Sequence, residues 1–339
     1  MKYLRRKLIL SIVALATIVV CFTSTTFAWF ARNSYAYIDN FEIEIENYDG
    51  LLISIDNEHF TSHVGNSELK KAIIAKTEGK DINDPTLTSG YIESQFLNYK
   101  FADVTTNDLK NFKEVDSKNA TNGYYDFKEA NKYHYIQFDL YFKMATYGND
   151  KTPYDLLFLD DNTASVMKVS KSFIESEDVT AKAITPFSYL VGDTFKIIEE
   201  GETLKFNPKN AMRVGLYNIN KDETFVYEPN LGISSYALEG GSGIHNPNAN
   251  LAFQYANSYS KYDLAPLKKT ESDTFDYENT HKDFADEVVL GSFENNGDGY
   301  NIIKLEMSIW LEGYDGDYIA GASLKPIRCY FSFYKKSRI

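Results

Sequence analysis

The chain has 339 residues, of which 43% are hydrophobic and 15% aromatic, with 26 tyrosines and 23 phenylalanines. This composition excludes wholesale disorder, favours β-structure and suffices for one large domain or two modest ones. The net charge of −13 argues against nucleic acid as a partner, because nucleic-acid-binding surfaces are basic. Only two cysteines are present, Cys21 and Cys329, so no framework of intrachain disulfides is expected.

The chain begins with a pattern typical of an export signal. Four basic residues among the first seven precede an uncharged apolar run over residues 8–22, and small residues follow. Cleavage after Ala28 fits this pattern and would leave Trp29 at the start of the mature chain. We therefore expect residues 1–28 to be a signal peptide that a signal peptidase removes.

A second interpretation of the same segment is an uncleaved membrane anchor. Residues 8–31 carry no charge, and a helix of that length could cross a hydrocarbon layer of about 30 Å. The four hydroxyl residues 23–26 favour cleavage over this alternative. Under either interpretation the basic end stays in the cytoplasm and the rest of the chain lies outside.

The first strand expected after the signal is Tyr35–Glu46. Phe41, Ile43 and Ile45 alternate there with three glutamates, which indicates a half-buried strand with an acidic outer face. A turn pattern follows, and Leu51–Ile55 is the next strand, so the two are expected to form a hairpin.

The next region combines a short helix with loops. Residues 67–76 place apolar side chains on one helical face. Residues 77–131 are rich in loop-forming types, with short strands expected at 95–101 and 124–127. Residues 133–144 alternate most regularly and predict a long strand.

The remaining pattern is again that of short strands. They are expected at residues 154–159, 166–169, 195–199, 203–206, 211–217, 224–227, 288–293, 302–311 and 327–334. The strands at 195–199 and 203–206 are expected to form a hairpin, and so are the strands at 211–217 and 224–227. Residues 181–189 are a helix candidate that Pro186 interrupts. So many strands with so little helix predict an all-β fold, a β-sandwich or jelly roll over residues 29–339.

Between residues 229 and 287 the alternation stops. Glycine, proline and asparagine are frequent there, which is typical of a loop insertion. Long loops in compact domains tend to be functional or disordered. We interpret the segment as an insertion into a single domain, and recognition of a glycan or a protein through it is one alternative function.

Four stretches of the chain resemble the TasA/camelysin-type proteins of Gram-positive bacteria. They are Phe27–Phe30 directly after the apolar run, Phe138–Lys143, Ala211–Val214 and Ile309–Asp317. Tyr318 departs from this resemblance, because some relatives carry a cysteine there. The resemblance implies export through a dedicated signal peptidase and a jelly-roll-like sandwich outside the cell.

The resemblance also implies a function. It indicates a surface or extracellular structural protein, a fibre or biofilm-matrix subunit whose partner is another copy of itself. Phe41, Ile43 and Ile45 would then belong to a donor strand that adds to the sheet edge of the next subunit. No enzymatic activity is expected under this hypothesis, although camelysin-type proteins are described as metalloproteases, which makes that activity the second alternative.

The metalloprotease alternative requires a metal site. His59 and His63 are four residues apart, but they lie in an expected loop and have no evident third ligand for zinc. Acidic turns supply candidate calcium ligands, and the candidates are Asp160, Asp161, Asp315 and Asp317. Hard cations favour such oxygens, yet aspartate is equally common in ordinary turns. No other cofactor is expected, and no Gly-x-Ser-x-Gly nucleophile pattern occurs.

Overall fold

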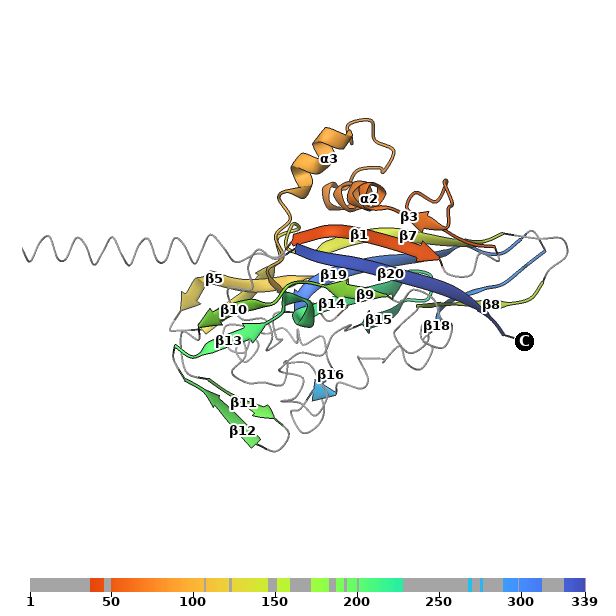
Figure 1. Cartoon of the computed structure of the whole chain (residues 1–339). Helices are drawn as coiled ribbons and strands as arrows, with labels where there is room; N and C mark the ends of the chain where they lie inside the picture. Colours follow the sequence, from red (N-terminus) through yellow and green to blue (C-terminus); the bar gives the residue numbers. More distant parts are fainter. Residues whose placement is uncertain are drawn as a thin grey trace, which may run out of the picture.

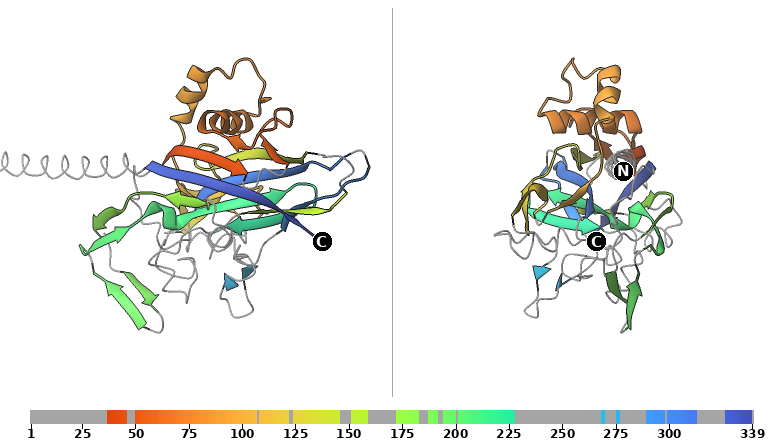
Figure 2. Two further views of the ribbon diagram at one scale, coloured as in Figure 1. Left: turned by 45° about the vertical axis from the view of Figure 1, so that its right-hand side comes forward. Right: turned by 90° about the vertical axis from the view of Figure 1, so that its left-hand side faces the viewer.

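The structure is a computed structural model in which most of the chain from Tyr37 onward is described. The described residues are 37–45, 50–106, 108–121, 124–145, 151–158, 172–182, 187–191, 194–199, 201–227, 268–269, 275–276, 289–297, 299–312 and 326–338. Two mixed β-sheets face each other, and a pair of helices lies against one side of them (Figures 1 and 2). The predicted all-β sandwich is confirmed.

Six of the described strands form the first sheet. Its order is β18 (Val289–Phe293), β8 (Tyr154–Phe158), β20 (Pro326–Ser337), β1 (Tyr37–Ile45) and β3 (His63–Val64), and β9 (Phe173–Glu175) also pairs with β20. β1 runs parallel to β20, and the other pairs in this sheet are antiparallel. The longest strand, β20, therefore lies at the centre of the sheet.

The second sheet contains eight strands within the described ranges. Its order is β15 (Glu223–Tyr227), β14 (Met212–Asn218), β19 (Ile303–Glu312), β4 (Asp103–Thr105), β5 (Lys113–Thr121) and β6 (Tyr124–Glu129), and β7 (Ile136–Met144) pairs with both β19 and β2 (Leu51–Ser54). The long strands predicted over residues 133–144 and 302–311 are thus β7 and β19, which lie side by side in this sheet.

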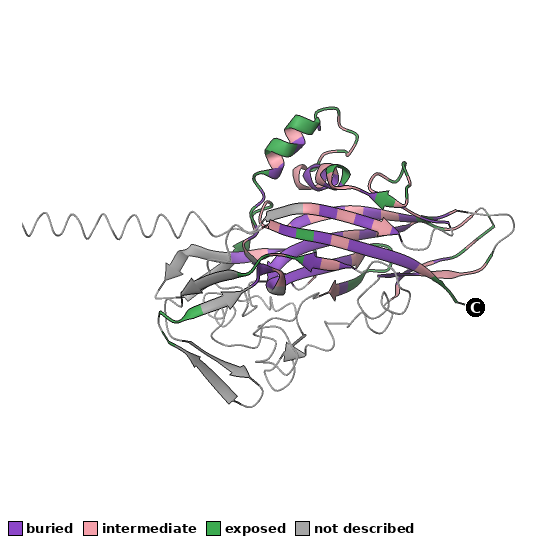
Figure 3. Ribbon diagram, in the orientation of Figure 1, coloured by how far each residue is buried: buried purple, intermediate pink, exposed green. Residues whose placement is uncertain are grey.

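Strand alternation builds the core between the two sheets. Along β7 the residues at even positions from Ile136 to Met144 are buried, and the residues between them are half-buried or exposed. β20 contributes Phe331 and Phe333 to the same core. Figure 3 shows buried residues along much of β20 and its neighbouring strands. Successive side chains of a strand point to opposite faces, so the two-residue period of the sequence becomes a buried inner face.

A second, smaller core lies on the outer face of the eight-stranded sheet. Trp310 of β19 points outward there, yet it is fully buried, because Val104, Leu109 and Phe112 pack over it. The ring of Phe112 meets the indole edge to face, with 5.7 Å between ring centroids. Every residue in the second half of β19 is therefore buried, including the polar Ser308 and Glu312, and three consecutive apolar residues, Ile309, Trp310 and Leu311, fill both faces of the strand.

Two α-helices follow β3. α2 (Asn66–Glu78) confirms the helix predicted at residues 67–76, and Gly79 ends it in the left-handed conformation at φ 64°. α3 (Ser89–Phe96) was not expected, and the strand predicted at residues 95–101 is wrong. The Thr88 side chain accepts a hydrogen bond from Tyr91 N at the start of α3, and such a cap favours a helix.

The hairpin expected between residues 35–46 and 51–55 is wrong, although both strands exist. β1 pairs with β20 and β3 in the six-stranded sheet, whereas β2 pairs with β7 in the eight-stranded sheet. The two strands therefore belong to different sheets. Both strands have an apolar inner face, and burying each against a different sheet satisfies that pattern as well as a hairpin would.

The strands between residues 179 and 206 also pair differently from expectation. β10 (Val179–Lys182) pairs with β13 (Thr203–Phe206), and β11 (Phe187–Val191) pairs with β12 (Thr194–Ile198). The hairpin predicted between residues 195–199 and 203–206 is therefore wrong, and so is the helix predicted at 181–189. Pro186 disfavours a helix there, which leaves the strand propensity of the flanking residues to decide.

Other predictions are confirmed or lie outside the described residues. The hairpin of β14 and β15 forms as expected, and a short 3₁₀ helix (Pro208–Ala211) leads into it. Within the insertion at 229–287 only β16 (Lys268–Lys269) and β17 (Phe275–Asp276) are described. The strand predicted at residues 166–169 lies outside the described part.

Candidate functional site

β1 is the element on which the candidate site is built. It lies between β20 and β3, and its register places Phe41 opposite Cys329 and Ile43 opposite Phe331. A parallel pair cannot be closed by a tight turn, so the partner strand comes from elsewhere in the chain. Here it comes from the last described strand, and β1 is held chiefly by contacts between residues far apart in sequence.

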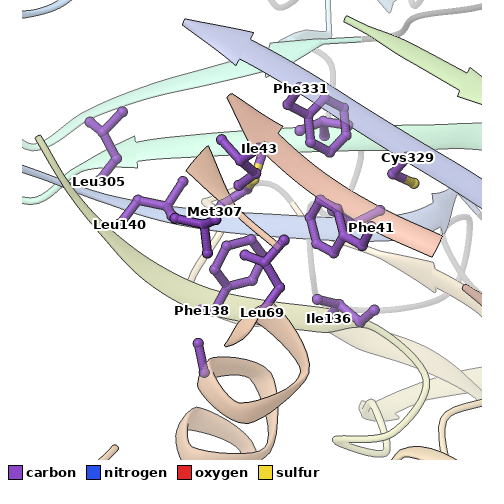
Figure 4. Close-up of a cluster of buried hydrophobic side chains, with 14 of the residues drawn as sticks. Phe41, Ile43, Leu69, Ile136, Phe138, Leu140, Leu305, Met307, Cys329 and Phe331 are labelled. Carbon is purple, nitrogen blue, oxygen red and sulfur yellow. The ribbon is translucent and has the colours of Figure 1, made fainter. Parts of the chain in front are cut away.

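The inner face of β1 fills the space between the two sheets. Phe41, Ile43 and Ile45 are at most 1% exposed. The Phe41 ring meets Phe138 and Phe331 edge to face, at centroid distances of 5.5 and 5.6 Å (Figure 4). Since Phe138 belongs to β7 and Phe331 to β20, one side chain of β1 contacts both sheets.

The outer face of β1 carries half-buried carboxylates. Glu44 Oε2 accepts a hydrogen bond of 2.5 Å from the Tyr330 hydroxyl, and the Tyr330 ring stacks on Phe173 at 5.3 Å. Glu42 Oε1 accepts one of 3.3 Å from the Asn40 amide. The predicted acidic outer face is thus present, and Glu44 ties β1 to its neighbour through a charge-assisted hydrogen bond.

The two edges of β1 are covered unequally. β20 pairs with it from Tyr37 to Ile45, with a bulge between Ile38 and Asn40. β3 pairs with it only at Ile43 and Glu44. Most of the backbone contact that holds β1 in its sheet therefore comes from β20.

The structure describes both histidines of the candidate zinc pair. His59 lies in the loop after β2, where its Nδ1 is 2.7 Å from Asp56 Oδ2, and His63 lies in β3. Burial alone would raise the pKa of Asp56, but hydrogen bonds from His59 and Glu58 outweigh it and lower the pKa well below its usual range. The pair does not share a helical face, and no third ligand joins it among the described residues.

The remaining predicted site residues cannot be placed. The calcium candidates Asp160, Asp161, Asp315 and Asp317 lie outside the described residues, as do the cleavage residues Ala28 and Trp29. Within the described ranges no three histidine, cysteine or acidic side chains are grouped so that they could hold a metal ion. No helix in the same ranges is long and apolar enough to cross a membrane, and residues 8–31 lie outside them.

Tyrosine and cysteine side chains can serve in binding or catalysis, but Tyr133, Tyr135 and Cys329 contribute to packing in this fold. Tyr135 stacks on Phe112 with 4.1 Å between centroids, and Tyr133 meets Tyr99 edge to face. Cys329 is fully buried, and burial raises the pKa of its thiol, so it is held as an unreactive thiol in the folded chain.

Sequence reasoning missed an ionic network beneath α2. Lys76 Nζ lies 2.8 Å from Asp139 and 2.5 Å from Glu306, and Lys304 lies 2.6 Å from the other oxygen of Asp139. Asp139 and Glu306 face each other across β7 and β19 on the outer surface of the sheet. The alternating patterns of β7 and β19 predict that Asp139 and Glu306 lie on an outer face of the sheet. Only the strand pairing shows that the two carboxylates lie side by side and require a cation.

Comparison with protein-family models, with curated proteins and with solved structures finds no match to this chain. The resemblance to the TasA/camelysin type therefore stays a prediction.

Proposed function

We propose that the chain is an exported structural protein of the cell surface or extracellular matrix, and that it assembles with copies of itself through β1. In the assembled form, β1 of one subunit occupies the place beside β20 of the next. Main-chain hydrogen bonds would supply affinity, and the pockets for Phe41, Ile43 and Ile45 would supply specificity. The export part rests on the basic and apolar start of the sequence.

The observation that carries this proposal is the pairing of β1. If β1 and β2 formed a hairpin, exchange would require both strands to leave together. Instead, β1 pairs with β20 and β3, whereas β2 pairs with β7 in the other sheet. Release of β1 would leave the pairing of β2 with β7 intact, and the site beside β20 would accept an identical strand. Exchange of identical elements between copies is a low-cost route to assembly.

Cysteine cross-linking between copies tests this directly. Glu42 and Tyr330 are register partners, and neighbouring strands lie about 4.8 Å apart, within the Cα range of a disulfide. Full chains carrying E42C and Y330C separately are co-expressed in the producing cells, and the surface fraction is run under non-reducing conditions. Disulfide-linked dimers are expected only when both variants are present.

Two controls make the result decisive. Each variant expressed alone reveals background pairing through the native cysteines. The double variant E42C/Y330C in one chain should form the bond within or between subunits, which shows that the two positions can react. If the double variant is oxidised but the mixture stays monomeric, β1 remains in its own subunit and the assembly proposal is wrong.

The export proposal has a separate test. Intact mass of protein recovered from the producing cells should give a start at or near Trp29, and electron microscopy of the same fraction should show fibres. A start at Met1 would instead support a membrane-anchored surface protein, for which exchange of β1 is sterically restricted.

A further inference from the structure

α2 and β3 together form a cap on β1. β3 pairs with β1 at Ile43 and Glu44, and the amide of Ile45 donates a 2.9 Å hydrogen bond to Ser62 O. Only Gly65 separates β3 from the first residue of α2. Movement of α2 therefore pulls on the segment that covers one edge of β1.

The apolar face of α2 continues the core that β1 fills. Leu69 and Ile73 are completely buried in the same cluster as Phe41 and Phe138. Figure 4 shows Leu69 reaching from α2 to the side chains of β7 and β1. The helix thus covers the place where β1 and β7 meet, and β1 cannot leave the core without disturbing these contacts.

Lys76 fastens this cap to the eight-stranded sheet. Burial alone would lower its pKa, but the hydrogen bonds to Asp139 and Glu306 outweigh it and raise the pKa, so the side chain is a cation at neutral pH. Lys76 is one-third exposed, whereas Glu306 is 13% exposed, so the pair is only partly screened by water. Losing Lys76 would leave Asp139 paired with Lys304 and would remove the cation that pairs with Glu306.

We infer that the α2–β3 cap gates the release of β1, and that the Lys76 contacts to Asp139 and Glu306 keep the gate closed. The cap would lift as one unit, uncover the β3 edge of β1 and loosen the core around Phe41. The importance of the gate for assembly rests on the strand exchange proposed above. The coupling between cap and strand can be measured without it.

Cys329 offers a probe for this opening. Its side chain is buried opposite Phe41, so it becomes accessible when β1 leaves. The full chain with Cys21→Ala is labelled with a thiol reagent in native buffer, and hydrogen exchange of the amides at 41–45 is followed in parallel. K76M is expected to raise the labelling rate and the exchange rate about tenfold. This factor corresponds to the free energy of about one charge-assisted hydrogen bond.

A matched variant separates the gate from general loosening of the helices. Lys70 lies on the same helix, but it pairs with Glu93 of α3 at 3.0 Å and not with the sheet. K70M should therefore change both rates less than twofold. If K76M fails to fold, I73V removes one methyl group from the buried face of α2 and should give a smaller increase in the same direction.

The outcomes are distinct. Equal rates in K76M and K70M, or faster exchange of α2 in K76M with β1 still protected, would overturn the gate. Faster labelling in K76M without any cross-linked dimers in the co-expression experiment would support the gate and refute strand exchange. Faster labelling together with more dimers would support both.

Discussion

Gly215 is a position where the absence of a side chain decides the packing. It lies on the outer face of β14, beneath Leu109 and Trp310 of the second core. A Cβ at this position would come within 2.5 Å of one Leu109 methyl carbon and 3.1 Å of the indole. Both neighbours are buried, so neither can move into solvent. The smallest possible side chain therefore allows a loop segment to lie directly on the sheet.

Gly215→Ala is accordingly expected to destabilise the protein by about 1–3 kcal/mol, the usual cost of overpacking. Equilibrium unfolding in urea measures this. Gly90→Ala is the matched control, because no atom lies within 4 Å of a Cβ there and alanine favours the helix. If the two variants had the same stability, the packing of Leu109 over β14 would be wrong.

The β5–β6 pair shows how one carboxylate holds an element in place. Glu114 of β5 lies 2.6 Å from Nδ1 of His134, 3.0 Å from Lys128 Nζ, and accepts from the backbone amide of Asn131. Burial alone would raise its pKa, but the hydrogen bonds from His134 and Lys128 outweigh it and lower the pKa to about 2. The carboxylate thus joins β5, β6 and the turn that leads into β7.

This gives a pH dependence with a defined sign. The folded pKa of Glu114 lies below its ordinary value of 4.5, so its stabilisation is complete above that value. It is lost as the pH falls toward 2. At neutral pH a pKa difference of this size corresponds to about 3 kcal/mol of stability. Thermal unfolding from pH 7 to pH 3 should show a smaller fall in stability for Glu114→Gln than for the native chain, and parallel curves would contradict the assignment.

At the scale of the whole molecule, β1 holds the sandwich together. The two sheets meet along the inner faces of β7, β19 and β20, and Phe41 contacts both. At one edge Thr61 exchanges backbone hydrogen bonds with Ile53 of β2, shortly before β3 pairs with β1. The β1 site must therefore be filled, by the chain's own strand or by a neighbour's.

Phe41→Ala should consequently cost about 3–5 kcal/mol of unfolding free energy, whereas Phe41→Leu should cost about 1 kcal/mol. Guanidinium unfolding of monomeric protein measures both. A loss below about 1 kcal/mol in the alanine variant would show that β1 does not occupy its own core in the monomer. In that case the site beside β20 would be open and assembly would require no release step.

Local alternation was enough to identify most strands and their inner faces. The alternation over residues 41–46 and 133–144 predicts one apolar face for each strand, and residues 41, 43 and 45 and the even positions of 136–144 form that face and are buried. The two-residue period depends only on neighbouring residues, and a strand with one apolar face has few ways to satisfy it. A local pattern also predicts α2, because its apolar residues recur at helical spacing along the sequence.

Only the tertiary structure decided which strands are neighbours. The alternating pattern predicts that β1 buries one face. It does not distinguish β2 from β20 as the strand that pairs with β1, since both have an apolar face. The cap on β1, the cation beneath α2 and the second core around Trp310 follow from that choice of partners. Contacts between residues far apart in sequence depend on how whole sheets pack, so a pattern of neighbouring residues does not predict them.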